Sequence, residues 1–492
     1  MKYKIIGIIS CAVVLILSIS VPLFRTEDKG RYHQHLQAEV PKSCNHMDNT
    51  LCTHLPLVEI YTDGIEIPGA AYHDPTSKKT QYTTTATGES ELLCRVAIKD
   101  REGVNHHTDD EADMESGAYI RIRGNSSREF DKKGYLLNFV TSSGENNPQE
   151  VMGMDAHHEW ALHGPFLDKT LLRNYMWYNI AGEIMDYSPN VRFCEVILNG
   201  EYKGLYLMTE TICAGKNGSR LNLSVDKKDN SFAGYCLRLD RGSENGLKNL
   251  STFTKYTYRI WGVQMNIEYP GTSNLTSEIA EGIRDDFNAF EKTMYSFDYD
   301  SKSHGYEETI DVDNFVKYLI INEFTCNYDA GSYSTYIYKD LDGLFRMCVW
   351  DYNNSCDNYQ ESVVNREDFF LQDKIWYFMF MKDKEFTEQC IKTYKELRKS
   401  YLNEEYLNNY IDETIQYLGD AITRNYDVWG YAFEKQEGLL YPADRNPAGY
   451  EEAVLQLKDF LKERGDWMDD NIDILRQFSA ESKAKLYNEY TE

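Results

Sequence analysis

Two aspartates, Asp329 and Asp351, flank a segment with the pattern of a β-hairpin. Its arms are "YSTYIY" and "LFRMCVW", and Asp342-Gly343 between them is a strong hairpin-turn signal. Because an antiparallel hairpin brings its two ends together, we expect the two carboxylates to lie close in space. Two carboxylates in a dry site repel each other unless a cation lies between them. Mg²⁺ binds carboxylates, amide oxygens and phosphates, and the asparagines close behind Asp351 would supply the amide oxygens.

A second segment, "RIRGNSSREFDKKGYLLNF", has residue types that suit phosphate binding. A predicted strand ends at Gly124, which would let the backbone approach a ligand closely. The hydroxyls of Ser126 and Ser127, with backbone N–H groups, could hold phosphate oxygens. Lys132 and Lys133 open the return strand, and because neighbouring side chains alternate, only one of them can face such a ligand.

A carboxylate also ends the predicted strand "YLMTETI", where Glu210 could pair with a buried lysine. A phosphate-binding loop, a cation, a metal-binding carboxylate and an acid that orients the acceptor hydroxyl are together what phosphoryl transfer requires. Each motif also has a simpler interpretation. Aspartates commonly cap turns, the lysine pair could be a solvated part of a polar hairpin, and Glu210 could lie at the surface.

The rest of the chain must supply the scaffold that positions these residues. Helical spacing predicts a helix over 168–185 with Asp168 as its N-cap, helices over 276–325, and a mostly helical chain after residue 365. An Asn199-Gly200 turn joins two of the expected strands. The fold class is therefore α+β, with a β-rich N-terminal part, a helical C-terminal part and a ligand site between them. Strands are expected over 55–62, 91–100, 118–124, 132–140, 192–198, 201–212 and 234–240.

The composition is that of an acidic globular protein. Hydrophobic residues make up 42% of the chain, which is enough for a folded core. The formal net charge of −27 argues against a nucleic-acid-binding surface, because such a surface needs cationic side chains for the phosphates. We therefore expect no nucleic-acid partner.

The N-terminus carries a targeting segment. Two lysines precede an apolar run from Ile5 to Phe24, which at about 1.5 Å per residue would span the hydrocarbon core of a bilayer. The run predicts a membrane anchor with a cytoplasmic N-terminal end. A signal peptide cleaved near Ser20 and a lipoprotein modified at Cys11 are the alternatives. All three put the bulk of the chain outside the cytoplasmic membrane, either single-pass or secreted to the cell surface.

These features divide the chain into five parts. The anchor or signal peptide occupies 1–24 and a juxtamembrane stalk 25–54, followed by a β-strand region over 55–117. The main domain then runs over 118–475, and a tail over 476–492.

The cysteines give no metal-binding motif. Of the 11 cysteines, all but Cys11 follow the apolar run, with no C-x-x-C pair and none of the spacings typical of zinc sites. Cys44 and Cys52 flank a short polar segment and could form a disulfide in an oxidising compartment.

The chain resembles the CotH kinase family, the atypical protein kinases similar to spore coat protein H. The resemblance covers roughly residues 55 to 475. The segments that carry it, in family order, are "YIRIRGNSSREFDKKGYLLNF", "WALHGPFLDKTLLRNYMWYNIA", "VILNGEYKGLYLMTETI", "GYCLRLD", "NYDAGSYSTYIY", "MCVWDYN" and "LKDFLKERGDWMDDNI".

The resemblance implies a protein-kinase-like fold that uses ATP with Mg²⁺ or Mn²⁺ to phosphorylate Ser or Thr of a protein substrate. By its place in the motifs, Asp329 would orient the acceptor hydroxyl and Asp351 would bind the metal. One lysine of the pair Lys132-Lys133 would contact the ATP phosphates, and Lys133 is favoured over Lys132 because it lies one residue deeper in the strand. Glu210 would be the ion-pair partner of this lysine, and the resemblance also implies that Trp350 borders the nucleotide.

The chain departs from the family pattern at two metal-binding positions. Ser334 and Asn353 stand where the family usually offers an amide and a carboxylate, so Mg²⁺ would be bound with less charge. Two rival functions follow. One is a kinase-fold surface module for binding or adhesion with weak turnover, and the other is a carbohydrate-active enzyme that uses an acidic pair.

Overall fold

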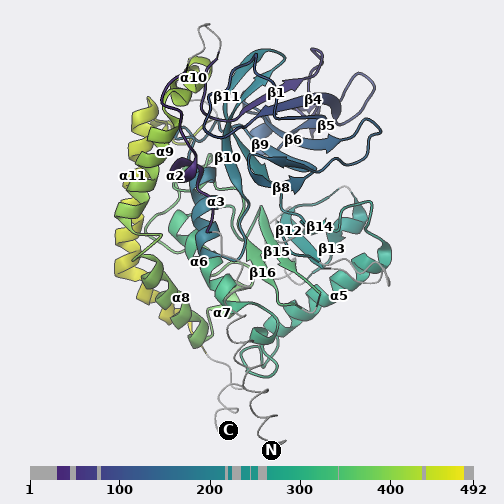
Figure 1. Ribbon diagram of the computed structural model, residues 1–492. Coiled ribbons are helices and arrows are strands. Elements are labelled where there is room, and N and C mark those ends of the chain that lie inside the picture. Colours follow the sequence, from purple (N-terminus) through teal and green to yellow (C-terminus); the bar gives the residue numbers. More distant parts are fainter. Residues whose placement is uncertain are drawn as a thin grey trace, which may run out of the picture. The chain divides into compact units, whose positions relative to one another are not determined.

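The computed structural model in Figure 1 describes residues 30–44, 51–74, 79–215, 220–223, 234–243, 245–252, 263–341, 343–434 and 439–480. The chain divides into two units, residues 1–33 and 34–492. Residues 30–33 of the first unit form neither helix nor strand. The predicted anchor over 1–24 and the end of the predicted tail lie outside the described residues. Within those ranges, no helix combines the length and apolarity needed to cross a membrane.

Seven strands of the larger unit close into a barrel, in the order β1-β10-β11-β9-β6-β5-β4 (Figure 1). The side chains of a strand point alternately to its two faces, and this explains the barrel core. In β5, for example, every second residue points inward and is buried. Ile60, Val96 and Ile120 are among the fully buried side chains that fill the interior. The strands are β1 (Leu57–Tyr61), β4 (Leu92–Lys99), β5 (Met114–Arg123), β6 (Gly134–Val140), β9 (Glu159–His163), β10 (Val191–Leu198) and β11 (Glu201–Glu210).

The turn between β10 and β11 lies where the sequence predicts it. Asn199 and Gly200 both have positive φ, 51° and 82°, as the predicted two-residue turn between β10 and β11 requires. Two small hairpins extend from the barrel strands. They are β2 (Ala71–Asp74) with β3 (Lys79–Tyr82), and β7 (Gln149–Val151) with β8 (Met154–His157).

A second sheet has the order β13-β14-β12-β15-β16. Its hairpin β15–β16 is the predicted one, with Tyr336 opposite Cys348, although Asp342 of the predicted turn lies outside the described residues. β12 pairs with β15, so that Leu239 lies opposite Thr335. The strands are β12 (Tyr235–Arg241), β13 (Asn249–Leu250), β14 (Val263–Tyr269), β15 (Thr335–Lys339) and β16 (Arg346–Cys348).

Helices surround the second sheet and one side of the barrel. α10 lies against β11, and α11 packs beside α6 and α9 (Figure 1). The α-helices are α2 (Gln34–Gln37), α3 (Arg173–Ile184), α5 (Ser277–Met294), α6 (Val312–Thr325), α7 (Tyr377–Phe380), α8 (Lys384–Leu397), α9 (Glu404–Leu418), α10 (Asp420–Trp429) and α11 (Tyr450–Asn471). Short 3₁₀ helices are η2 (Ser126–Arg128), η3 (Gly246–Lys248), η4 (Tyr306–Glu308), η5 (Gly430–Phe433), η6 (Ala443–Arg445) and η7 (Ile472–Phe478).

The helix predicted from Asp168 begins later than expected, at Arg173. The intervening turn contains Leu171, whose φ of 67° cannot continue a helix. Asp168 still stabilises the start of the helix, because its carboxylate accepts a 2.9 Å hydrogen bond from the backbone N–H of Arg173. The same carboxylate pairs with the Arg173 guanidinium at 2.6 Å, and both side chains are buried.

The predicted stalk over 25–54 is part of the folded unit from Gln34 onward. Buried Gln34 exchanges two hydrogen bonds with the backbone of Phe193, at 3.1 and 2.7 Å. His35 contacts the Tyr175 hydroxyl at 2.9 Å. The side-chain amide of Gln34 thus completes the β10 ladder just where its pairing with β1 ends.

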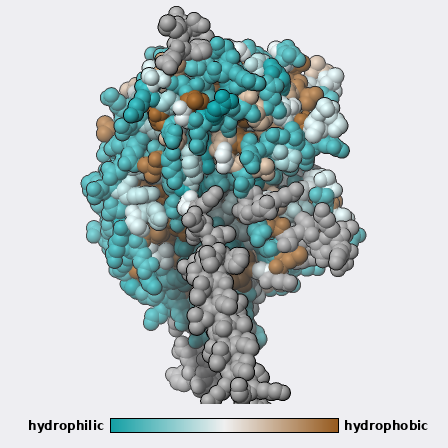
Figure 2. Space-filling view, viewed as in Figure 1, coloured by the Kyte–Doolittle hydropathy of each residue, from teal (hydrophilic) through white to brown (hydrophobic). Residues whose placement is uncertain are grey.

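The fold class is α+β, as predicted, with a β-rich N-terminal barrel and helices toward the C-terminus. The face seen in Figure 2 is mainly hydrophilic, with hydrophobic residues scattered over it and not gathered in one patch. Such scattered apolar residues are ordinary for a protein surface.

Candidate active site

The carboxylates of Asp329 and Asp351 lie within electrostatic reach of each other, since the charge of Asp329 acts on the pKa of Asp351. Both are half-buried. Burial, and then the charge of Asp329, raise the pKa of Asp351 to about 7, while Arg123 acts in the opposite direction. Without a cation the Asp351 carboxyl group therefore binds a proton more readily than an exposed aspartate does.

Asp329 lies in the loop that follows α6. The helix ends because Cys326 takes a left-handed conformation with φ of 44°. The Asp329 carbonyl accepts backbone hydrogen bonds from Ser332 and Tyr333, at 2.9 and 2.8 Å, which close the loop into a tight turn. Burial raises the pKa of Asp329, and a 2.9 Å hydrogen bond from the Asn354 side-chain amide opposes that rise.

Helix α3 positions the loop that carries Asp351. The backbone N–H of Asp351 donates to the Tyr178 hydroxyl at 3.0 Å. The next backbone N–H, that of Tyr352, donates to Asn174 Oδ1 at 2.8 Å. Asn174 and Tyr178 are four residues apart and so share one helix face. Arg173 also donates to two carbonyls of this loop, so a buried helix fixes the loop from one side.

Ser334 and Asp351, both predicted metal ligands, face each other. The Ser334 side chain lies close enough to the Asp351 carboxylate to lower its pKa, which favours the charged form. Both residues have left-handed backbones, with φ of 47° for Ser334 and 62° for Asp351. Such conformations are uncommon outside glycine and asparagine, and they cluster at functional sites.

Asn353, two residues after Asp351, has an unsatisfied hydrogen-bond acceptor. Its Nδ2 donates to Asn354 Oδ1 at 3.0 Å, whereas its Oδ1 is buried and has no hydrogen-bond partner among the described residues. A buried acceptor left in this way costs roughly 1–3 kcal/mol. Two carboxylates, a hydroxyl and an unsatisfied amide oxygen form a set of hard oxygen donors, which fits Mg²⁺ or Mn²⁺.

A third carboxylate, Asp240, belongs to the same site but was missed in the sequence. Its charge raises the pKa of both Asp329 and Asp351. Asp240 is the last residue but one of β12, and the pairing of β12 with β15 brings this end of the strand next to the 329–334 loop. The one signal in the sequence was an aspartate at the end of the predicted strand "GYCLRLD".

Two arginines, also missed, bring positive charge to these acids. Arg123 at the end of β5 lowers the pKa of Asp351. Its guanidinium lies 5.4 Å from the ring centre of Trp350 and donates to His163 at 3.2 Å. Trp350 itself is 7% exposed and stacks on Tyr178, so it borders the site mainly as a platform for Arg123.

Arg241 links the acids to the predicted phosphate loop. It ends β12 and lowers the pKa of Asp329. With the Asn125 amide oxygen turned toward the guanidinium, Arg241 Nε lies 2.8 Å from that oxygen. The loop after β5 therefore lies beside the carboxylates.

That loop is tightly folded. Gly124 has φ of 105°, and a Cβ atom there would lie 1.9 Å from the Ser127 hydroxyl, so only glycine fits. Arg128 Nε donates to the Gly124 carbonyl at 2.7 Å. Burial lowers the pKa of Arg128, and so do Arg121 and Arg123 nearby. A cluster of arginines in so acidic a chain is suited to an anionic ligand. Ser126, the other predicted phosphate contact, is exposed at the start of η2.

The two predicted lysines have different environments. Lys133 donates to the Arg128 carbonyl at 2.7 Å, so its ammonium lies against the loop. Lys132 is buried and donates to the Leu205 carbonyl at 2.6 Å and to Asn425 Oδ1 at 2.7 Å. Burial lowers the pKa of Lys132 well below its usual value. The prediction of Lys132 as a phosphate ligand is wrong, because its side chain ties the barrel to α10.

The predicted pairing of Glu210 with Lys133 also needs correction. Glu210 lies opposite Trp160, whereas Lys133 lies beside Gly164, whose Cβ position would be 2.6 Å from the Lys133 carbonyl. Trp160 and Gly164 are four residues apart, so the positions of Glu210 and Lys133 along the strand direction differ by roughly 13 Å. Buried Glu210 instead accepts hydrogen bonds from the backbone and side chain of Asn190, at 2.9 and 3.1 Å.

Lys374 lies beside Asp329, and no local signal in the sequence could have identified it. Its ammonium donates to the carbonyls of Tyr328 and Ala330, both at 3.3 Å. Burial lowers the pKa of Lys374 to about 8, against the opposing charges of Glu323 and Asp329. The 329 loop is thus bordered by a cation as well as by carboxylates.

Two comparisons show which known proteins this chain is similar to. A family model described as CotH kinase protein matches residues 120–468, which includes the loop after β5, all three carboxylates and Arg464 near the C-terminus. The chain is also similar to inner spore coat protein H of Bacillus subtilis (strain 168), with 24% identity over 238 residues. That alignment covers 48% of this chain and 57% of the relative, so the match spans just over half of the relative's length.

Proposed function

The chain belongs to the CotH kinase family, and on that premise we propose that it is an atypical protein kinase. It transfers the γ-phosphoryl group of ATP to a Ser or Thr hydroxyl of a protein. The bond from the γ-phosphorus to the bridging oxygen breaks, a bond to the acceptor oxygen forms, ADP leaves, and the hydroxyl proton passes to solvent. This reaction depends on positioning and charge stabilisation more than on covalent chemistry by the protein.

The observation that carries the proposal is that the charge of Asp329 acts on Asp351, two residues before an asparagine with an unsatisfied amide oxygen. Asp329 would accept the hydrogen bond of the acceptor hydroxyl and orient its oxygen for attack. Asp351, Ser334 and Asn353 would hold a divalent cation. Bound Mg²⁺ or Mn²⁺ would offset the charge of the phosphates.

The ATP phosphates would meet the loop after β5. The backbone N–H groups around Ser126 and Ser127, with Arg123 and Arg128, offer donors and positive charge on the barrel side. Lys133 lies against the same loop and would contact a phosphate directly. A barrel that holds phosphates and a helical part that holds the carboxylates would correspond to the two lobes of a protein kinase, and this supports a kinase-like fold.

A surface location is part of the proposal. The apolar run from Ile5 to Phe24 would hold the domain outside the cytoplasmic membrane. The relative in Bacillus subtilis is by name an inner spore coat protein, which supports a coat or cell-surface address. The acceptor would then be a protein at that surface.

A second candidate is a binding or adhesion module with little turnover. It is favoured by Ser334 and Asn353, which bring no charge to the cation. ATP binding without transfer would distinguish this module from a kinase.

The test uses the full-length chain in detergent with γ-labelled ATP, Mg²⁺ or Mn²⁺, and dephosphorylated casein. Label should pass to casein Ser or Thr, and Asp329→Asn should reduce the rate at least about 100-fold, because the orienting acid is lost. The matched control is Asp313→Asn, an exposed acid paired only with Lys317 in the described structure. Transfer that survives Asp329→Asn would overturn the role of Asp329. A nucleotide-induced thermal shift with no transfer would favour the binding module, and the absence of both would overturn both functions.

A further inference from the structure

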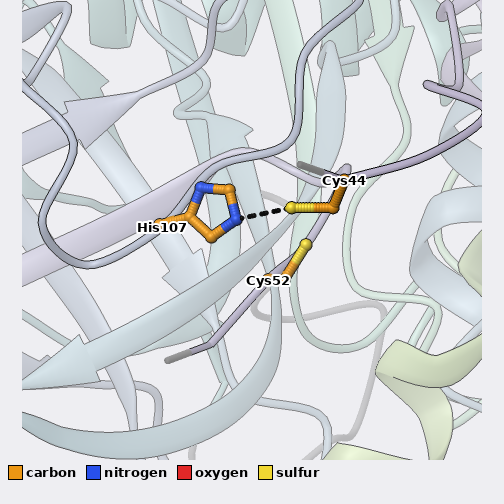
Figure 3. A group of neighbouring side chains, drawn as sticks. All are labelled: Cys44, Cys52 and His107. Carbon is orange, nitrogen blue, oxygen red and sulfur yellow. Dashed lines mark hydrogen bonds between the residues drawn. The ribbon is translucent and has the colours of Figure 1, made fainter. Parts of the chain in front are cut away.

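Three metal-ligating side chains gather outside the site described above. Cys44 and Cys52 are eight residues apart and His107 lies in the loop after β4, and their ligand atoms all lie within 4.8 Å of one another (Figure 3). Cys44 is exposed, Cys52 is half-buried and His107 is buried. In Figure 3 the two sulfur atoms lie on the same side of the His107 ring, which points one nitrogen at them.

Backbone hydrogen bonds hold Cys52 beside His107. The neighbouring residues Thr53 and His106 form an antiparallel bridge, with N–H···O distances of 3.1 and 2.7 Å in the two directions. The Lys99 ammonium donates to the His107 carbonyl at 2.9 Å. The loop after β4 is therefore fixed against the segment that carries Cys52.

The other cysteine is tied to the same loop. The Asn105 side-chain amide donates to the Ser43 carbonyl at 3.4 Å, one residue before Cys44. The Cys44 sulfur then lies 3.0 Å from His107 Nε2. Two separate contacts thus bring the Cys44 segment to the His107 loop.

The His107 ring is oriented as a metal ligand would be. Its Nδ1 lies 3.2 Å from an Asp110 carboxylate oxygen, and the same oxygen accepts the His107 backbone N–H at 2.7 Å. With the Nδ1 proton directed to this carboxylate, the lone pair of Nε2 faces the sulfurs. A carboxylate behind a histidine is the usual arrangement at metal sites, because it fixes the tautomer and the ring.

From this geometry we propose that Cys44, Cys52 and His107 bind a zinc ion, with Asp110 orienting the histidine. Zn–S bonds of about 2.3 Å and Zn–N bonds of about 2.0 Å in a tetrahedron put ligand atoms roughly 3.6–3.8 Å apart, which the cluster can reach with small shifts. Sulfur and imidazole nitrogen are the donors that zinc prefers. The described residues supply three ligands, and water or a further donor completes the tetrahedron.

Zinc binding would release protons and would stabilise the N-terminal segment. Each thiol gives up its proton on binding, so one zinc ion releases two protons. The ion joins the N-terminal segment around Cys44 to the loop after β4 and so stabilises the packing of that segment on the barrel. This role is independent of the proposed kinase function, since none of its residues lies in that site.

The test measures zinc in the full-length chain purified under reducing conditions without added metal. We expect about one zinc per chain, and thiolate-to-metal charge-transfer absorption after replacement by Co²⁺. Two variants, the double variant Cys44→Ser/Cys52→Ser and the single variant His107→Asn, should each reduce bound zinc at least about tenfold. The matched control is Cys213→Ser, because Cys213 also lies near a histidine, 3.5 Å from His157 Nε2, but the described residues offer no third ligand there.

Three outcomes would overturn the proposal. One is a Cys44–Cys52 disulfide, detected by mass spectrometry as the loss of two hydrogens, with no zinc bound after its reduction. Another is zinc that dialysis removes equally from the wild-type chain and from every variant. The last is zinc that remains in both cluster variants while circular dichroism shows that they are folded.

Discussion

The side-chain amide of Asn354 donates a 2.9 Å hydrogen bond to the carboxylate of Asp329. This bond favours the charged form of Asp329, against the burial that raises its pKa. Asn354 therefore connects the two loops of the candidate active site, since it lies three residues after Asp351. It acts through Asp329 and so is a positioning residue.

We predict that Asn354→Ala shifts the acid side of the pH–rate profile. Loss of the hydrogen bond removes stabilisation of the charged carboxylate, so the pKa of Asp329 rises and activity is lost at a higher pH. A hydrogen bond to a charged group is worth about 1.5–3 kcal/mol, which corresponds to a shift of about one to two pH units. The measurement is kcat/KM for phosphate transfer between pH 5 and 8. Asn365→Ala, at an exposed asparagine, is the control, and an unmoved acid limb in Asn354→Ala would contradict the role.

A second prediction concerns the cation. Asn353→Asp adds a negative charge beside Asp351, Asp329 and Asp240, which repel one another when no cation is bound. The variant should unfold at a lower temperature without metal and show a larger stabilisation by Mg²⁺ than the wild type, with affinity increased by about tenfold. Thermal unfolding across a Mg²⁺ titration checks both effects. If Mg²⁺ stabilises the variant and the wild type equally, Asn353 is not a ligand.

The close approach of Asp329 and Asp351 could be predicted from the sequence because a hairpin is a local structure. The arms "YSTYIY" and "LFRMCVW" alternate, and antiparallel pairing leaves little choice about where their ends lie. Asp240 and Arg123 reach the same place through the pairing of β12 with β15 and through closure of the barrel. No local pattern specifies those long-range pairings, so these two residues were missed.

The environments of Lys132 and Lys133 could not be predicted from the sequence. Neighbouring side chains of a strand point to opposite faces, but this rule does not show which face packs against another element. Helix α10, almost 300 residues away, supplies the Asn425 that binds Lys132. The proposed zinc ligands were missed for a similar reason, because Cys52 and His107 are 55 residues apart and the Thr53–His106 bridge brings them together.

A third prediction concerns the buried ion pair behind the 329 loop. Arg464 on α11 is fully buried, and it donates to the Glu323 carbonyl at 2.9 Å and to its carboxylate at 3.4 Å. Glu323 in turn accepts backbone N–H groups, including that of Leu371 at 2.7 Å. Arg464→Met leaves this buried carboxylate without its cation, and it should lower the free energy of unfolding by about 3–5 kcal/mol.

Urea denaturation monitored by circular dichroism measures this loss. The control is Arg476→Met, because Arg476 pairs with Glu388 and Asp473 at the exposed surface, where such pairs are worth at most about 1 kcal/mol. If the two substitutions lower the free energy of unfolding equally, the buried ion pair between Arg464 and Glu323 stabilises the fold no more than an exposed pair does.

The last prediction concerns stability in acid. Burial, and then the charges of Arg220 and His158, lower the pKa of His157 to about 3. The neutral ring is required because Nδ1 accepts the backbone N–H of Glu159 at 3.0 Å. A histidine whose pKa is lower in the folded than in the unfolded state, where it is near 6.5, contributes its full stabilisation above about pH 6.5. This contribution is lost as the pH falls from about 6.5 toward 3, since the unfolded chain then binds a proton that the folded chain does not.

Between pH 6.5 and 5 this one group should cost up to about 2 kcal/mol of unfolding free energy, at about 1.4 kcal/mol per pH unit. His157→Asn can still accept the Glu159 N–H through its amide oxygen but cannot titrate. The variant should therefore lose less stability than the wild type over this pH range. His73→Asn, at an exposed histidine, should leave the slope unchanged. Urea denaturation at pH 5, 6 and 7 measures the slopes, and parallel slopes for wild type and His157→Asn would show that other buried groups dominate the acid response.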